Sequence, residues 1–212
     1  MNTTLFNYRI ATITSLIVDD TVEASKLLPM PLQTHINQRK SAHDKAASTQ
    51  TWLLLKDYLL EQGLNQHDWF SHIQFSRAGK PSFQQTFPIM HFNFSHAAEK
   101  VICAISNSQL IGVDIEKIVS FDYAVLNSYF TVSEANYIAQ AVNQAYAFFT
   151  LWTKKEALLK CVGIGIASID LATIEVLADS VIYQQKQYTF YPINAGMEYV
   201  AYACLCDVNN PV

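Results

Sequence analysis

Two acidic residues near the middle of the chain have a spacing that suits cation binding. Asp114 and Glu116 lie two apart in the segment Ile111-Gly-Val-Asp-Ile-Glu-Lys117. Residues i and i+2 share one face of a strand, so a strand here places two carboxylates side by side, with the apolar residues on the opposite face. Adjacent carboxylates repel each other unless a cation or hydrogen bonds intervene. Taken alone, the pattern fits the solvated face of an edge strand better than a metal site.

A third carboxylate lies at the edge of an apolar helical stripe. Glu156 follows Trp152 by four residues and precedes Leu159 by three, so it borders the buried side of the predicted helix. A carboxylate there needs a partner that offsets its desolvation. Lys160 follows at i+4, and a plain surface Glu–Lys pair, worth about 0.2–0.5 kcal/mol, explains the spacing equally well.

A hydroxyl and an imidazole, Ser95 and His96, end a strand-like segment. Such groups can hold a phosphate together with free backbone N–H groups, although a hydrogen-bonded structural histidine is the simpler interpretation of His96. No order of nucleophile, base and orienting acid indicates a Ser/His/Asp triad. The basic residues that could meet an anion are Arg39, Lys40, Lys45 and Lys80, which by default are solvated charges.

The elements that position these residues can be predicted from periodicity and turn residues. In the first part of the chain the pattern predicts a strand within Leu5–Thr14, a helix from about Ser48 to Gly63, a strand at Ser71–Phe75, a turn at Arg77–Pro81, and a hairpin of Val101–Ser106 with Leu110–Glu116. In the second part it predicts a capping box at Thr131 and Glu134, a helical stripe to Gly163 with a break near Asn143, and strands from Leu171 to Tyr199–Cys206. Mixed strands and helices without βαβ alternation favour the α+β class.

Composition narrows the function classes. Half of the 212 residues are hydrophobic and 15% are charged, which excludes a disordered chain. With 14 Lys and Arg against 18 Asp and Glu, no long-range positive field attracts nucleic acid or an anionic membrane. No signal peptide or membrane span is predicted, and four cysteines without an export signal indicate reduced thiols in the cytoplasm. Cys204 and Cys206 alternate with apolar residues, so we interpret them as core residues rather than metal ligands.

Four blocks, in this order, form a rare combination. They are Gly79-Lys-Pro81, Phe92-Asn-Phe-Ser-His96, Ile111-Gly-Val-Asp-Ile-Glu116 and Trp152-Thr-Lys-Lys-Glu-Ala-Leu-Leu-Lys160. Together they resemble the 4′-phosphopantetheinyl transferases, specifically the larger, monomeric type that activates carrier proteins of peptide, polyketide or fatty-acid synthases. The resemblance spans Gly79 to Gly165, and the flanks match more loosely.

The resemblance implies an activity, a fold and a metal site. Members of the family transfer the phosphopantetheine arm of coenzyme A to a serine of an apo acyl or peptidyl carrier protein and release 3′,5′-ADP. Their fold is two similar α/β halves with the coenzyme between them, here residues 1–100 and 101–212. By motif match, Asp114, Glu116 and Glu156 bind Mg²⁺, which agrees with the preference of a hard cation for oxygen ligands. Lys160 faces the pyrophosphate, and Glu156 takes the proton of the serine. Glu134 matches a position near the metal, although the capping box accounts for it equally well.

The resemblance also assigns coenzyme contacts. Gly79, Lys80 and Pro81 match the turn against the adenine, and Ser95 and His96 match contacts to the phosphates. The N-terminal half departs from the family pattern, because counting back nine residues from Lys56 gives Ala47 rather than a basic residue. The basic residues available to hold the 3′-phosphate instead are Arg39, Lys40 and Lys45. Ser48 falls where a hydroxyl contact to the coenzyme is often found in the family.

Two other functions stay open on the sequence alone. One is an Mg²⁺-dependent hydrolase of a nucleotide pyrophosphate, and the other is a catalytically silent relative that binds a carrier protein or coenzyme. The intact Asp114, Glu116, Glu156 and Lys160 argue against the silent relative. The segment Phe121–Phe130 is a candidate carrier-docking surface, with ordinary core packing as the alternative.

Overall fold

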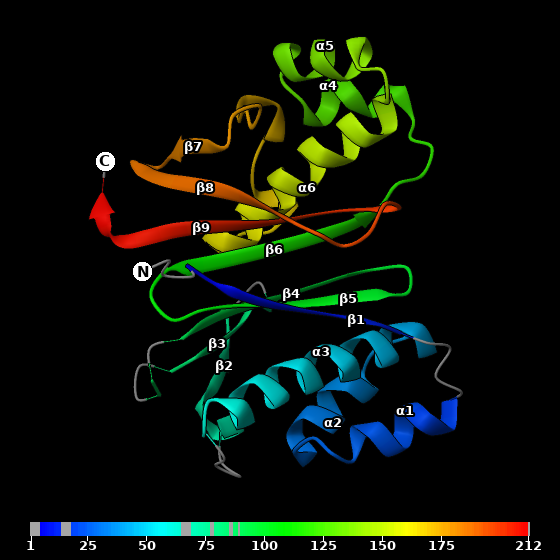
Figure 1. Cartoon of the computed structure of the whole chain (residues 1–212), viewed down its shortest axis with the longest axis vertical. Coiled ribbons are helices and arrows are strands. Elements are labelled where there is room, and N and C mark those ends of the chain that lie inside the picture. Colours follow the sequence, from blue (N-terminus) through cyan, green and yellow to red (C-terminus); the bar gives the residue numbers. More distant parts are fainter. Residues whose placement is uncertain are drawn as a thin grey trace.

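Two antiparallel sheets lie face to face, and helices cover the outer face of each (Figure 1). The computed structural model describes residues 5–13, 18–64, 69–76, 79–84, 87–88 and 90–211. The layers therefore run helix, sheet, sheet, helix, and the α+β class predicted from the sequence is confirmed.

The first sheet has the strand order β1-β5-β4, and a two-stranded ribbon of β2 and β3 lies beside it. Helix α3 packs on this sheet, with α1 and α2 against α3 (Figure 1). The elements of this half are β1 (Asn7–Thr12), α1 (Val18–Ser25), α2 (Met30–Asn37), α3 (Ala42–Glu61), a 3₁₀ turn (Trp69–His72), β2 (Ile73–Phe75), β3 (Pro81–Phe83), β4 (His91–Ala97) and β5 (Lys100–Ser106).

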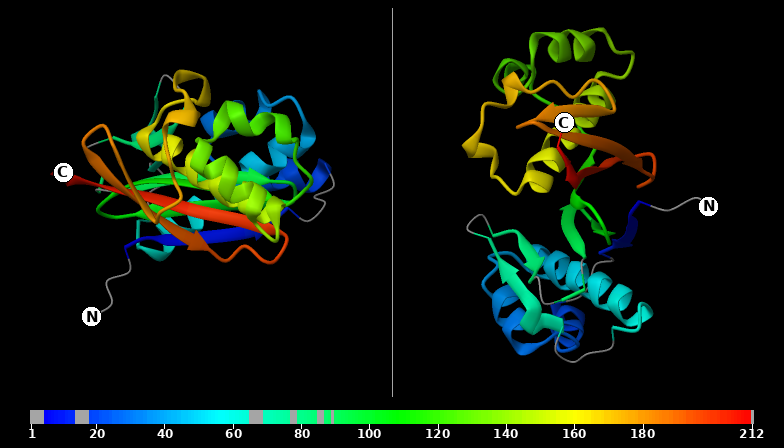
Figure 2. Two further views of the ribbon diagram at one scale, coloured as in Figure 1. Left: turned by 90° about the horizontal axis from the view of Figure 1, so that it is seen from above. Right: turned by 90° about the vertical axis from the view of Figure 1, so that its left-hand side faces the viewer.

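The second sheet has the order β6-β9-β8-β7. Helix α6 lies along β6 and β9, as the left-hand view of Figure 2 shows, and α4 and α5 lie beyond it. The elements of this half are β6 (Leu110–Lys117), α4 (Leu126–Tyr129), α5 (Val132–Gln140), α6 (Gln144–Val162), β7 (Ser180–Tyr183), β8 (Lys186–Ile193) and β9 (Tyr199–Pro211), with 3₁₀ turns at Tyr123–Val125, Ile166–Ser168 and Leu171–Thr173.

The predicted hairpin of Val101–Ser106 with Leu110–Glu116 is wrong. β5 pairs with β4 through the tight turn at Ala98 and Glu99, whereas β6 pairs with β9 from the far end of the chain. Residues 107–109 therefore carry the chain from one sheet to the other. Local alternation identified both strands, but their partners depend on tertiary packing.

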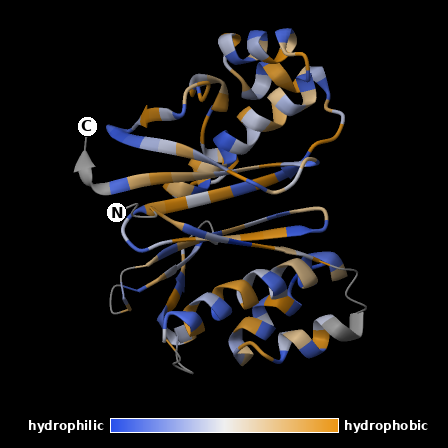
Figure 3. Cartoon of the chain, viewed as in Figure 1, coloured by the Kyte–Doolittle hydropathy of each residue, from blue (hydrophilic) through white to orange (hydrophobic). Residues whose placement is uncertain are grey.

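The space between the sheets is filled by small and β-branched residues. Ile102 and Ala104 of β5 pack against Ile111, Val113 and Ile115 of β6, all of them buried. Hydrophobic residues run along both strands in Figure 3. This arrangement confirms that the odd-numbered residues of β6 face the core, which leaves Asp114 and Glu116 on the other face.

The helix ends follow from the residues that stand there. Asn143 caps α6 by accepting a hydrogen bond of 3.0 Å from the N–H of Tyr146, and Gly163 ends the helix with φ +85°.

The four cysteines are buried free thiols, and Cys204 and Cys206 belong to the core beneath α6. Within the described ranges, none of the helices combines the length and the apolarity that crossing a bilayer requires.

Candidate active site

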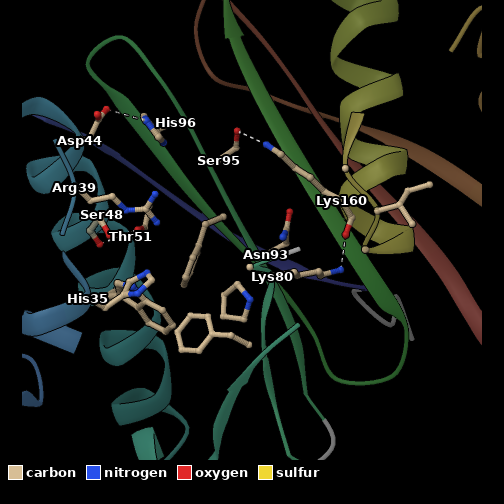
Figure 4. Close-up of a pocket in the computed structure, with 18 residues that line it drawn as sticks. His35, Arg39, Asp44, Ser48, Thr51, Lys80, Asn93, Ser95, His96 and Lys160 are labelled. Carbon is tan, nitrogen blue, oxygen red and sulfur yellow. Dashed lines mark hydrogen bonds and ion pairs between the residues drawn. The ribbon is translucent and has the colours of Figure 1, made fainter. Parts of the chain in front are cut away.

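A cavity of about 500 Å³ opens between the N-terminal half and the last turn of α6 (Figure 4). One wall is aromatic: Trp52 and Phe94 meet edge to face with ring centroids 5.0 Å apart, and His35 stacks on Phe75 at 5.1 Å. The opposite wall is polar and is formed by β4 and α6. Of the predicted site residues, the cavity is lined by Arg39, Ser48, Gly79, Lys80, Pro81, Ser95, His96 and Lys160.

Ser95 and Lys160 of the polar wall form a hydrogen-bonded cluster with Asp114 of β6, which, like Glu116 and Glu156, does not itself line the cavity. The Lys160 ammonium donates to Asp114 Oδ1 at 2.6 Å and to Ser95 Oγ at 2.9 Å, and the Ser95 hydroxyl donates to the same Asp114 oxygen at 2.8 Å. Asp114 is only 3% exposed, so it does not lie on a solvated outer face. Its second oxygen, Oδ2, is buried and has no hydrogen-bond partner. A buried carboxylate oxygen without a partner is free to accept a ligand.

Glu116 and Glu156 carry negative charge close to Asp114. Burial, and then the neighbouring Asp114 charge, raise the pKa of Glu116 to about 7, even though the Trp152 indole donates to Glu116 Oε1 at 3.1 Å. Burial and then Asp114 also raise the pKa of Glu156, which Lys160 partly offsets. Glu156 has no hydrogen-bond or ion-pair partner within the described part of the chain.

The Mg²⁺ site that the motif match implies at Asp114, Glu116 and Glu156 stays a prediction. Among the residues that the structure describes, no three side chains of the His, Cys, Asp and Glu types come together closely enough to hold an ion. Lys160 pairs with Asp114, and the Trp152 indole donates to Glu116. The donor set nevertheless fits a hard divalent cation, because Asp114 Oδ2 lacks a partner and the neighbouring Asp114 charge helps to raise the pKa of both glutamates.

Gly112 explains how the helix can bring Lys160 to Asp114. A Cβ atom at Gly112 would lie 2.1 Å from the carbonyl oxygen of Ala157 and 2.2 Å from the backbone nitrogen of Cys161. Only a residue without a side chain therefore lets the α6 backbone rest directly on β6. This close approach sets the distance between the helical lysine and the strand aspartate.

A basic corner forms the outer rim of the cavity. The His96 side chain, 46% exposed, lies 4.0 Å from the Asp44 carboxylate, and the His43 ring lies 6.3 Å from the His96 ring. In Figure 4 the Arg39 guanidinium extends from the helical side toward the same space. Of the predicted basic residues, Lys45 lines a separate cavity of about 360 Å³, and Lys40 lines neither. The structure therefore brings Arg39 to the site and leaves the two lysines outside it.

Two other motif residues, Lys80 and Asn93, line the cavity but use their polar atoms on backbone groups at the interface between the halves. The Lys80 ammonium donates to the carbonyl oxygens of Ile111 and Cys161, each at 3.2 Å, and to that of Lys160. The side-chain oxygen of Asn93 accepts the N–H of Val113 at 2.9 Å. Burial lowers the pKa of Lys80. The remaining residues of the predicted turn, Arg77 and Ala78, lie outside the described residues.

Glu134 acts as a helix cap, one of the two roles that the sequence left open. Its Oε2 accepts the N–H of Thr131 at 2.8 Å, and the Thr131 hydroxyl accepts the N–H of Glu134. Its Oε1 accepts the N–H of Val176, and its carboxylate pairs with the Lys155 ammonium at 2.8 Å, both side chains being 0% exposed. With both oxygens bound and no exposure, the Glu134 carboxylate is fully used by the cap and the ion pair, which supports the capping role over a catalytic one.

Sequence reasoning missed several residues of the cavity wall. Asn93 lies inside a block that was recognised, but only its neighbours Ser95 and His96 were singled out. His35, Trp52 and Phe75 come from three separate elements and carry no spacing signal. Aromatic residues in apolar stripes are more often core than site, so the sequence alone offered nothing that distinguishes these three.

Comparison with known proteins places this geometry in a family. Residues 110–203, which include β6, α6 and part of β9, match the sequence model of the 4′-phosphopantetheinyl transferase superfamily. The 4′-phosphopantetheinyl transferase gsp of Aneurinibacillus migulanus is 35% identical over 158 residues, which cover 73% of this chain and 65% of that protein. The chain is thus similar to members of the 4′-phosphopantetheinyl transferase superfamily.

Two further relatives from the superfamily match shorter stretches. The 4′-phosphopantetheinyl transferase psf-1 of Bacillus pumilus is 38% identical, covering 42% of this chain and 38% of psf-1. The 4′-phosphopantetheinyl transferase Sfp of Bacillus subtilis (strain 168) is 37% identical, covering 46% of this chain and 44% of Sfp. The chain thus spans less than two thirds of these curated relatives.

Among solved structures, the holo-[acyl-carrier-protein] synthase of Thermotoga maritima aligns with a TM-score of 0.36 and 11% identity, over 47% of this chain and 64% of that one. This similarity is too low to establish a shared fold.

Proposed function

We propose that this protein transfers the 4′-phosphopantetheine arm of coenzyme A to a serine hydroxyl of an apo acyl or peptidyl carrier protein, with release of 3′,5′-ADP. The observation that carries the proposal is the Lys160–Asp114–Ser95 cluster, of which Lys160 and Ser95 line the cavity. It joins one residue from each of three motifs that lie far apart in the sequence. The gsp, psf-1 and Sfp relatives, each named as a 4′-phosphopantetheinyl transferase, support the same activity.

The proposed chemistry forms one phosphorus–oxygen bond and breaks another. The carrier serine oxygen attacks the phosphorus that bears the pantetheine arm, and the bond from that phosphorus to the bridging oxygen breaks. Glu156 accepts the serine proton as the general base, directly or through water. The Lys160 ammonium faces the cavity and stabilises the charge that develops on the departing 3′,5′-ADP.

We propose that Asp114, Glu116 and Glu156 hold Mg²⁺, with Asp114 contributing its unpartnered Oδ2. A bound Mg²⁺ supplies electrostatic neutralisation of the diphosphate and of the carboxylates around it. In its absence the Glu116 and Asp114 charges repel, which is one cause of the raised pKa of Glu116. The Lys160 ammonium beside Asp114 offsets part of this repulsion.

The two walls of the cavity suit the two ends of coenzyme A. The aromatic wall, with Gly79 and Pro81 at its edge, can receive a flat base, and the polar wall can receive phosphates. We assign phosphate contacts to Ser95, His96 and Arg39, and a hydroxyl contact to Ser48. Of Arg39, Lys40 and Lys45, the basic residues that the sequence offered for the 3′-phosphate, we therefore retain only Arg39.

We further propose that the two halves are similar units, divided near residues 100–110, and that the protein is a cytoplasmic monomer. Each half has an antiparallel sheet with helices on its outer face, as the right-hand view of Figure 2 illustrates. The buried free thiols agree with a reducing compartment.

For carrier docking, the segment Phe121–Phe130 divides into two sets of residues. Leu126 and Phe130 are 8% and 3% exposed and belong to the core, whereas Tyr123 is 52% exposed. We therefore restrict the proposed docking role to Tyr123. Tyr123→Ala is expected to raise the KM for the carrier protein several-fold with an unchanged KM for coenzyme A. An unaltered carrier KM in a stably folded variant would remove Tyr123 from the docking surface.

Mass spectrometry of several apo carrier proteins, each incubated with this protein, coenzyme A and Mg²⁺, tests the proposed activity. The expected result is that at least one carrier gains the mass of the phosphopantetheine arm. Release of nucleotide without modification of any carrier would indicate a hydrolase instead. Binding of carrier or coenzyme without turnover would indicate a silent relative.

A further inference from the structure

Strand β6 is an edge strand whose free side is met by side chains instead of another strand. On one side β6 pairs with β9 along its whole length, from Leu110 to Lys117. On the other side, β4 of the N-terminal sheet lies alongside, but the two strands belong to different sheets. An edge strand leaves backbone N–H and C=O groups without partners, and each that is buried needs one.

Asn93 and Lys80 supply two of those partners from the N-terminal half. Asn93, 6% exposed, accepts the N–H of Val113 at 2.9 Å. Lys80 donates to the carbonyl oxygen of Ile111 at 3.2 Å. A side-chain acceptor and a side-chain donor thus satisfy β6 two residues apart.

Lys80 also holds the end of α6. Its ammonium donates to the carbonyl oxygens of Lys160 and Cys161, which belong to the last turn, where carbonyl groups lack helical partners. Figure 4 shows the Lys80 side chain directed at the carbonyl oxygen of Lys160 rather than into the open space. A positive charge at a helix C-terminus is also favoured by the helix dipole.

The three contacts account for all the hydrogen-bonding capacity of the Lys80 ammonium. A lysine side chain has three N–H donors and no acceptor, and here three carbonyl oxygens receive them. A phosphate or a base could take a hydrogen bond from this ammonium only by displacing a protein contact. The side chain that the motif suggested as a coenzyme contact is therefore used by the protein itself.

We propose that Asn93 and Lys80 are positioning residues, which hold β6 and the end of α6 in register with the N-terminal half. Each contacts the backbone at or next to a residue of the reactive cluster: Asn93 at Val113, beside Asp114, and Lys80 at Lys160 itself. Together they keep Lys160 and Asp114 opposite Ser95. The consequence for catalysis rests on the proposed function, whereas the positioning itself does not.

The kinetic test uses Lys80→Met, with Lys80→Gln as a milder second variant. Because misplacement by about 1 Å can cost roughly 100-fold in rate, kcat is expected to fall by about 10- to 100-fold while the KM for coenzyme A changes by less than about threefold. Lys26→Met is the matched control, since Lys26 is an exposed lysine paired only with Glu23 on α1. A tenfold or larger rise in this KM with an unchanged kcat would overturn the proposal and make Lys80 a coenzyme contact.

A second measurement is independent of activity and separates failure of this inference from failure of the proposed function. Amide hydrogen exchange, read by ¹⁵N NMR, is compared at Val113 in the wild type and in Asn93→Leu. Loss of the acceptor is expected to speed exchange of the Val113 amide about tenfold, with amides of β8 unchanged. Unchanged exchange at Val113 would overturn the proposal even in a fully active protein. Faster exchange in a protein that modifies no carrier would support the positioning and count against the proposed transferase alone.

Discussion

Replacing Gly112 by alanine tests whether close packing of α6 on β6 sets the reactive geometry. The added Cβ would lie 2.1 Å from the Ala157 carbonyl oxygen, whereas ordinary contacts begin at 3.4 Å, so the helix backbone has to retreat by more than an ångström. The atoms that the new Cβ would meet, in Ala157 and Cys161, are all backbone atoms of α6, so a change of side-chain rotamer cannot relieve the contact. The retreat carries Lys160, at the end of the same helix, away from Asp114.

We expect two measurable effects of Gly112→Ala. Forcing a methyl group into this contact costs about 1–3 kcal/mol in the free energy of unfolding, measured by urea titration. A displacement of roughly 1 Å lowers kcat by about 100-fold, measured as arm transfer to a carrier protein. Gly165→Ala is the stability control, because its Cβ would meet only Ser168 Oγ at 4.0 Å and should change the free energy by less than about 0.5 kcal/mol. A Gly112→Ala protein with wild-type stability and wild-type kcat would show that the close packing of α6 on Gly112 does not set the position of Lys160.

Three further predictions follow from the carboxylates. Glu156→Gln should lower kcat by about 100-fold or more without loss of fold, as shown by circular dichroism, and near-normal turnover at saturating Mg²⁺ would exclude it as the base. In the metal-free folded protein the pKa of Glu116 is about 7, above the ordinary 4.5 of the unfolded chain, so the folded state binds the Glu116 proton more tightly. The contribution of this proton to the free energy of unfolding is therefore present below about pH 4.5 and is lost as the pH rises from about 4.5 to 7. The melting temperature should therefore fall less between pH 5 and pH 8 in Glu116→Gln than in the wild type; an equal fall would contradict this. Glu134→Ala leaves the buried Lys155 ammonium without its ion-pair partner and should lower the free energy of unfolding, measured by urea titration, by about 3–5 kcal/mol. A loss of turnover at full stability would instead restore a catalytic role to Glu134.

The local elements and the reactive motifs were predictable from the sequence because each has a short-range signal. The capping box at Thr131 and Glu134, the break at Asn143 and the stop at Gly163 all stand where the pattern placed them. Alternation in β6 also fixed which face carries Asp114. Such features depend on the backbone and on neighbours within a few residues.

What the sequence did not reveal depends on contacts between distant segments. Nothing local distinguishes a β5–β6 hairpin from the observed pairing of β6 with β9. The destination of the Lys80 ammonium was equally hidden, because its carbonyl partners lie 31 to 81 residues away. The position of Arg39 inside the cavity, with Lys40 and Lys45 outside it, follows from how α2 and α3 pack and not from charge alone.

The central claim is that Lys160, Asp114 and Ser95 form the reaction centre of a phosphopantetheinyl transfer. The most direct measurement follows two products of one reaction by mass spectrometry: arm-modified carrier protein and free 3′,5′-ADP, in wild type and in Lys160→Ala. We expect the wild type to form both products in a one-to-one ratio, and folded Lys160→Ala to form both at least 100-fold more slowly. Modified carrier formed at the wild-type rate by Lys160→Ala, or nucleotide released without modified carrier, would contradict it.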